Sequence, residues 1–145
     1  MSTRAMITYV LDFGEDFENT GRYIYQHSDG YPEYLGKKVE EFLSSKGASA
    51  RFTDGEYLMA WLLWYLIEER MMEKREWDEL RIERGEEPFY NVGEKPLDNL
   101  NDLTGFGMST EMHCDIEYLY VIVGNERKLM TYDTYENKMI DEMSF

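Results

Sequence analysis

Residues 116–123, IEYLYVIV, are the most strand-like stretch of this chain. Polar and apolar side chains alternate at first, and the stretch then becomes wholly apolar, which is typical of a strand buried in a sheet. Gly124-Asn125 supplies a turn, and residues 128–135, KLMTYDTY, complete a hairpin. The C-terminal third of the chain is therefore predicted to form antiparallel sheet.

Two further strands and two helices are predicted before this hairpin. Residues 5–13 and 22–28 are rich in β-branched and aromatic side chains, which favours strands. An apolar stripe predicts a helix over 32–46, and a second, longer helix is predicted over 54–84. The order ββααββ then predicts one α+β domain, residues 1–145, with a mainly antiparallel sheet packed against the two helices.

The composition is strongly acidic, with 30 Asp and Glu against 15 Lys and Arg and a net charge of −15. This excess disfavours direct binding to nucleic acid or to an anionic membrane surface, and it favours a basic partner protein or a simple role in solubility. The single cysteine, Cys114, can form no intramolecular disulfide, which favours a reducing compartment. The longest apolar run, residues 57–67, is shorter than the roughly 20 residues that cross a bilayer.

Familiar catalytic motifs are missing from the sequence, which has no phosphate-binding loop, dinucleotide fingerprint, zinc-protease motif, nucleophile elbow or CxxC pair. We therefore expect no enzyme, no cofactor and no metal. Both histidines nevertheless precede an aspartate by two positions, as His27 and Asp29 and as His113 and Asp115. Side chains at i and i+2 of a strand share a face, so the two pairs converge if their strands are neighbours. The simpler alternative is that Asp29 caps the first helix or closes the turn, that His27 lies on the sheet surface and that Glu117 faces solvent.

Three short motifs resemble those of a known group of proteins. They are STRA at residues 2–5, YQHSDGYP at 25–32 and DIEYLY at 115–120. Small proteins found largely in phages, prophages and mobile elements share a TR[AS] step, a DGYP turn and a DIEYxY strand. The resemblance implies an α+β core and an accessory protein made in the cytoplasm of an infected host cell. It carries over no catalytic residue, because no activity is established for the group.

The favoured hypothesis is a non-enzymatic inhibitor that occupies a basic surface of a host protein that handles nucleic acid, in the manner of DNA-mimic, anti-CRISPR or other anti-defence proteins. Acidic residues of the second helix and of the loop beyond it are the candidate contacts: Glu68, Glu69, Glu73, Glu76, Glu79, Glu86, Glu87 and Glu94. Met71, Met72 and Trp77 either join them as a partner-binding stripe or are the apolar side of a solvated helix.

The alternative hypothesis is a small-ligand or nucleotide-binding protein, including a metal-assisted enzyme, built on the two His-Asp segments. Its candidate residues are Arg4, Tyr25, His27, Asp29, Tyr31, His113 and Asp115. Aromatic rings would stack on a base, and Arg4 would meet a phosphate. A third hypothesis is a homodimer formed through the exposed edges of a four-stranded sheet.

Overall fold

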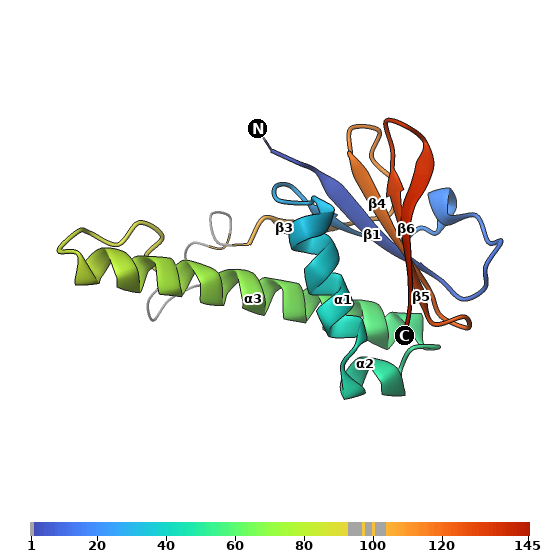
Figure 1. Ribbon diagram of the computed structural model, residues 1–145, viewed down its shortest axis with the longest axis horizontal. Helices are drawn as coiled ribbons and strands as arrows, with labels where there is room; N and C mark the ends of the chain where they lie inside the picture. Colours follow the sequence, from blue (N-terminus) through green and yellow to red (C-terminus); the bar gives the residue numbers. More distant parts are fainter. Residues whose placement is uncertain (1, 93–96, 98–99, 101–103) are drawn as a thin grey trace. The chain divides into compact units, whose positions relative to one another are not determined.

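The computed structural model describes residues 2–92, 97, 100 and 104–145, and it confirms the α+β class (Figure 1). The elements follow in the order β1 (Ala5–Val10), η1 (Phe17–Asn19), β2 (Tyr23–Gln26), η2 (Pro32–Gly36), α1 (Lys37–Leu43), α2 (Lys46–Ala50), α3 (Gly55–Glu83), β3 (Phe106–Ser109), β4 (Tyr118–Val123), β5 (Lys128–Asp133) and β6 (Lys138–Ser144). Here η1 is a 3-10 turn and η2 is a π-helical turn.

The chain divides into two compact units. The first comprises the residues up to Leu63 together with Phe106–Phe145, and the second comprises Trp64–Gly105. Helix α3 begins in the first unit and continues into the second, so the division falls within one helix. The expectation of a single domain stays a prediction.

The sheet belongs to the first unit and has six strands in the order β3-β2-β1-β4-β5-β6. The predicted antiparallel sheet is confirmed only in part, because β1 and β4 pair in parallel. These two strands are joined by most of the chain, and such a long crossover is what parallel pairing requires. The prediction of four strands is wrong at both edges: β3 lies in a region expected to be loop, and β6 was not expected. Strand β6 carries charges and is exposed, so it lacks the buried face that marks a strand in the sequence.

The predicted first helix is interrupted. It begins at Pro32 as the turn η2, continues as α1 and ends at Leu43. Ser45 then starts α2, because its hydroxyl oxygen accepts a hydrogen bond from the Ala48 N–H at 3.2 Å. Gly47, the residue directly after the predicted first helix, lies inside α2.

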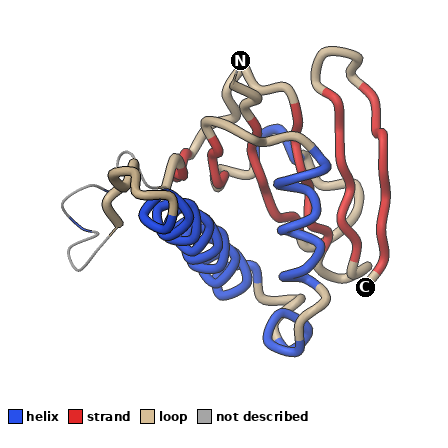
Figure 2. The backbone as a smooth tube through the Cα atoms, turned by 60° about the vertical axis from the view of Figure 1, so that its left-hand side comes forward, coloured by secondary structure: helices blue, strands red, loops and turns tan. Residues whose placement is uncertain are grey.

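One face of the sheet packs against the helices of the first unit, as Figure 2 shows for α1. Tyr120 donates a hydrogen bond to the Gly30 carbonyl oxygen at 2.7 Å, and Tyr9 donates one to the Phe52 carbonyl oxygen at 2.8 Å. The turn at Gly30 lies directly on β1, because a Cβ atom at this position would come within 2.6 Å of the Ala5 Cβ. This contact places the turn that follows β2 against the start of β1.

The opposite face of the sheet packs against the 3-10 turn η1 and against residues 110–117, which form neither helix nor strand. The buried core on this face of the sheet consists of Met6, Val10, Tyr23, Ile116, Leu119, Val121, Val123 and Met130. Phe17 of η1 and Met112 pack against this core, so residues 110–117 lie over the face. The segment is attached to β1 by hydrogen bonds from the Glu117 N–H to the Arg4 carbonyl oxygen, 2.8 Å, and from the His113 N–H to the Met6 sulfur, 3.4 Å.

Among the described residues, no helix has the length and the apolar character needed to span a membrane.

Candidate functional site

Tyr25 is the centre of an aromatic cluster in the first unit. Its ring centroid lies 4.8 Å from that of His113 and 6.0 Å from that of His27. The Tyr25 hydroxyl and His27 Nδ1 are 3.0 Å apart and share a hydrogen bond. The two histidines, which are 86 positions apart in the sequence, thus contact the same tyrosine.

The route by which the histidines meet differs from the expected one. The two pairs were expected to converge only if their strands were neighbours, but β1 lies between β2 and β4. His113 belongs to neither strand, because it lies in the segment 110–117 that covers the sheet face. Tyr25 points to that face from β2, since it pairs with Met6 in the register of β1 and β2. The covering segment therefore brings the His113 ring to Tyr25.

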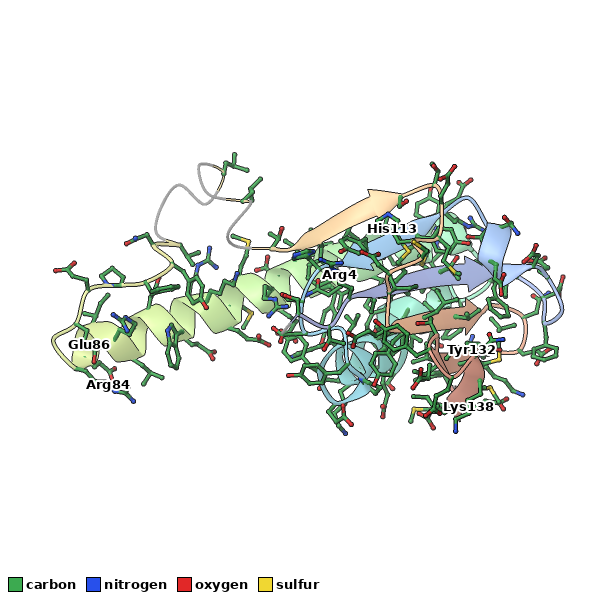
Figure 3. The ribbon with its side chains drawn as sticks, turned by 90° about the horizontal axis from the view of Figure 1, so that it is seen from above. Arg4, Arg84, Glu86, His113, Tyr132 and Lys138 are labelled. Atoms are coloured by element: carbon green, nitrogen blue, oxygen red, sulfur yellow. The ribbon has the colours of Figure 1, made fainter. Side chains whose placement is uncertain are left out.

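Arg4 and Asp115 form an ion pair close to this cluster. The Arg4 Nη1 and the Asp115 Oδ2 are 2.5 Å apart, and the two side chains are 39% and 50% exposed. Burial raises the pKa of Tyr25, and the nearby Arg4 lowers it while Asp115 raises it by smaller amounts. Tyr25 is therefore a neutral hydroxyl at neutral pH, available as donor or acceptor. Figure 3 labels Arg4 and His113 on the sheet unit.

Asp29 and Tyr31 have a different setting from the other predicted ligand-binding residues. Asp29 adopts a left-handed backbone conformation, with a φ of 58°, in the turn after β2. The Tyr31 ring packs 6.2 Å from that of Tyr34, at the start of the turn η2. Both residues thus shape the connection from the sheet to the helices.

The space beside Tyr25 is open on its outer side. Gly107 of the edge strand β3 pairs with Tyr25, and a Cβ atom at Gly107 would meet no atom within 4 Å. A half-buried tyrosine ring with two imidazoles and a guanidinium can stack on a planar molecule and hydrogen-bond its polar groups. Within the described part of the chain, no three His, Cys, Asp or Glu residues are placed to hold a metal ion.

The predicted acidic contacts lie in the second unit. Glu68, Glu76, Glu79, Glu86 and Glu87 are exposed. Figure 3 shows Glu86 at the C-terminal end of α3, where its carboxylate pairs with Arg81 at 3.0 Å.

The remaining three acids differ from these. Glu69 and Glu73 are partly buried and have interactions of their own. Glu94 lies outside the described residues. The exposed part of the predicted acidic surface therefore consists of the five glutamates named above.

Large apolar side chains are exposed among these acids. Met72 is 45% exposed, Trp77 47% and Leu80 45%. Met71 was hypothesised to belong to the same stripe, and this is wrong, because it is buried against Val92. Met71 and Met72 are adjacent in the helix and point about 100° apart, so only one of them can face the segment that follows the helix.

Asp78 is a residue of the candidate site that the sequence patterns did not single out. It is 6% exposed, and its Oδ1 accepts hydrogen bonds from the N–H groups of Phe89 and Tyr90, while Oδ2 accepts one from Asn91, each at 2.8 Å. Burial alone would raise the pKa of Asp78, but these backbone donors outweigh burial and lower it. The carboxylate thereby fastens residues 89–91 to α3. In the sequence, Asp78 is one acid among many on a charged helix.

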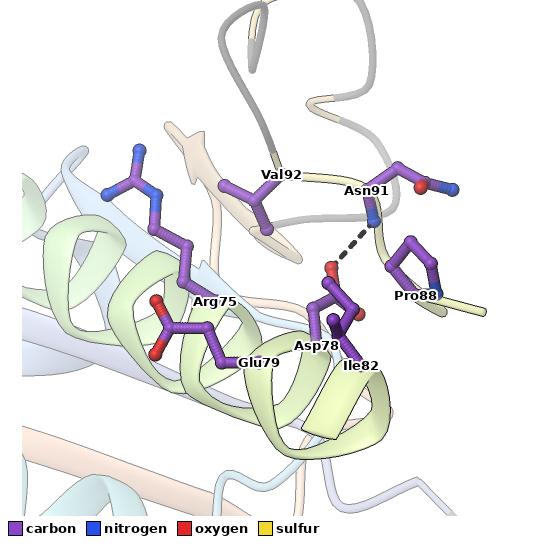
Figure 4. A pocket seen from close by; sticks show the side chains of 7 residues that line it. All are labelled: Arg75, Asp78, Glu79, Ile82, Pro88, Asn91 and Val92. Carbon is purple, nitrogen blue, oxygen red and sulfur yellow. Dashed lines mark hydrogen bonds between the residues drawn. The ribbon is translucent and has the colours of Figure 1, made fainter. Parts of the chain in front are cut away.

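A pocket of about 350 Å³ lies beside this carboxylate and is open to solvent (Figure 4). Its lining residues are Arg75, Asp78, Glu79, Ile82, Pro88, Asn91 and Val92. All of them belong to the second unit. The pocket combines apolar walls with two carboxylates and one guanidinium.

Comparison with known proteins gave no match: no family model fits the chain, and no curated protein or solved structure is significantly similar to it. The resemblance to small phage proteins accordingly stays a prediction.

Proposed function

We propose that this protein acts by binding another protein, as an acidic inhibitor that occupies a basic surface of a host protein that handles nucleic acid. The observation that carries the proposal is the composition of the exposed surface of the second unit. Five glutamates are exposed there together with Trp77 and Leu80 on the same helix.

Solubility alone explains the charge but not the exposed rings. A helix that only needs to be soluble gains nothing from a half-exposed tryptophan, whereas tryptophan is enriched among the residues that dominate binding energy. The glutamates would speed association with a basic groove and compete with a phosphate backbone for it. A phage or mobile-element protein of the anti-defence or anti-CRISPR type would use such a surface inside the host cell.

Affinity capture from a host lysate tests the proposal. We expect the immobilised protein to retain a basic protein, to lose it as salt is raised, and to lose it when duplex DNA is added as a competitor. The double variant Glu76→Gln/Glu87→Gln should weaken retention by at least about five-fold. The control Glu18→Gln/Glu111→Gln removes the same charge from exposed positions of the first unit and should change retention by less than about two-fold. Retention that ignores salt and DNA, or an equal effect of both variants, would contradict the proposal.

A second candidate function is the binding of a nucleotide or a similar planar anion at the Tyr25 cluster. The contact of both histidines with Tyr25 and the open space at Gly107 favour it. Arg4 is already paired with Asp115, so a phosphate would have to displace that carboxylate.

Titration with a nucleoside monophosphate, followed by NMR, tests this second function. Asp115→Asn should tighten binding because it removes the competitor for Arg4, and Tyr25→Leu should weaken it because it removes the stacking ring. Absence of saturable shifts at residues 25–27 and 113 in the wild-type protein would sink this candidate.

A further inference from the structure

We propose that the pocket beside Asp78 receives an arginine side chain of the basic partner. This inference rests on the proposed function and names the contact by which the partner is anchored. It is argued from the pocket walls and the charges around them (Figure 4) and from the volume of the pocket.

The walls of the pocket suit an aliphatic chain. Ile82, Pro88 and Val92 line it, and Figure 4 shows Ile82 beside Asp78 with Pro88 facing them from the returning segment. Ile82 is 57% exposed, so much of its apolar surface has no cover from the chain. A long side chain that buries its methylene groups here while keeping its charged end near water gains apolar contact without losing hydration.

The charges at the pocket favour a cation. Asp78 and Glu79 carry two negative charges against one positive charge on Arg75. Asp78 is committed to the backbone N–H groups of residues 89–91, so it attracts a cation without serving as its main acceptor. Glu79 is exposed at the rim and offers a carboxylate that a guanidinium can engage with two parallel hydrogen bonds.

Arginine fits this arrangement better than lysine. Its planar guanidinium matches a carboxylate in a bidentate manner and is weakly hydrated, while a lysine ammonium is a compact, strongly hydrated charge. A volume of about 350 Å³ is at the small end of ligand pockets, which suits a single side chain more than a large cofactor. Arginine is also the cation most enriched among residues that dominate protein interfaces.

The test uses N-acetyl-L-arginine N-methylamide as the probe and its citrulline analogue, which has the same shape and no charge, as the control ligand. We expect saturable NMR shifts of backbone amides within residues 75–92 in the wild-type protein. The citrulline compound should bind at least about five-fold more weakly, because it lacks the charge that strengthens the hydrogen bonds to Glu79.

Two variants of one helix provide a matched comparison. Glu79→Gln should weaken binding of the arginine compound by about five-fold, since it removes the charge at the rim. Glu76→Gln removes the same charge from a position that does not line the pocket, and it should change binding by less than about two-fold. Ile82→Ala should also weaken binding, because it removes part of the apolar wall.

Equal binding of the arginine and citrulline compounds, shifts outside residues 75–92, or equal effects of the two glutamine variants would each overturn the pocket assignment. The outcomes also separate this inference from the proposed function. A captured basic protein together with an arginine compound that does not bind would leave protein binding intact and refute the pocket. Binding of the arginine compound without any captured basic protein would support the pocket and count against the proposed function.

Discussion

Removing the Asp78 carboxylate is the change with the most direct consequence for the second unit. Three backbone N–H groups, those of Phe89, Tyr90 and Asn91, donate to it at 2.8 Å. Hydrogen bonds to a charged group contribute about 1.5–3 kcal/mol each, so the three together have a gross value of about 4.5–9 kcal/mol. Phe89 and Asn91 are exposed, and their N–H groups can therefore recover hydrogen bonds from water once released.

This partial rehydration reduces the expected loss. We predict that Asp78→Ala lowers the free energy of opening of residues 89–91 by about 2–4 kcal/mol. Since about 1.4 kcal/mol corresponds to a factor of ten, amide exchange of these three residues should accelerate by about 30-fold to 700-fold. Hydrogen exchange followed by NMR measures the three amides individually.

Two further variants test whether the Asp78 carboxylate itself protects these amides. Asp78→Asn keeps one oxygen for Phe89 and Tyr90 and presents an NH2 group to Asn91, so it should accelerate exchange less than Asp78→Ala, and most at Asn91. Glu79→Gln removes the same charge from the adjacent exposed position and should leave exchange at the three amides within about three-fold of wild type. Protection that survives in Asp78→Ala would show that the carboxylate does not hold the segment.

Three other predictions concern the pKa of Asp78, the close packing at Gly124 and the ion pair of Arg4. Backbone donors lower the folded-state pKa of Asp78, so the stability that its carboxylate contributes is fully present above pH 3.8, the ordinary pKa, and is lost as the pH falls through the lowered pKa. The amide shifts of residues 89–91 should titrate in that acidic range, and Asp78→Asn should abolish the titration. Gly124→Ala should destabilise the protein by about 2–4 kcal/mol in chemical denaturation, because the new Cβ would lie 2.6 Å from the Tyr9 Cζ; a change below about 1 kcal/mol would contradict this. Arg4→Ala should cost less than about 1 kcal/mol in urea unfolding, because its ion pair with Asp115 is exposed; a larger loss would mean that the pair fixes the covering segment.

The strongest periodic patterns determined the elements that they predicted. The apolar stretch of β4, the hairpin to β5 and the long helix α3 appear close to their expected limits, because each buries enough apolar surface for its periodicity to dominate local preferences. The edge strands β3 and β6 were missed because they are short or charged and owe their conformation to the neighbour with which they pair.

The candidate sites, like the secondary-structure elements, were predictable from the sequence only in part. The sequence by itself identified Arg4, His27 and His113 as candidate ligand-binding residues and determined that the chain is acidic. Residue type and charge can be read without knowledge of the fold. Only the tertiary structure decided that the histidines meet at Tyr25, since a covering segment without periodicity brings one of them there. It alone also decided that Asp78 turns inward while its neighbour Glu79 stays in water. Which acid is buried depends on where backbone N–H donors of a distant segment come to lie, and that position is set by packing.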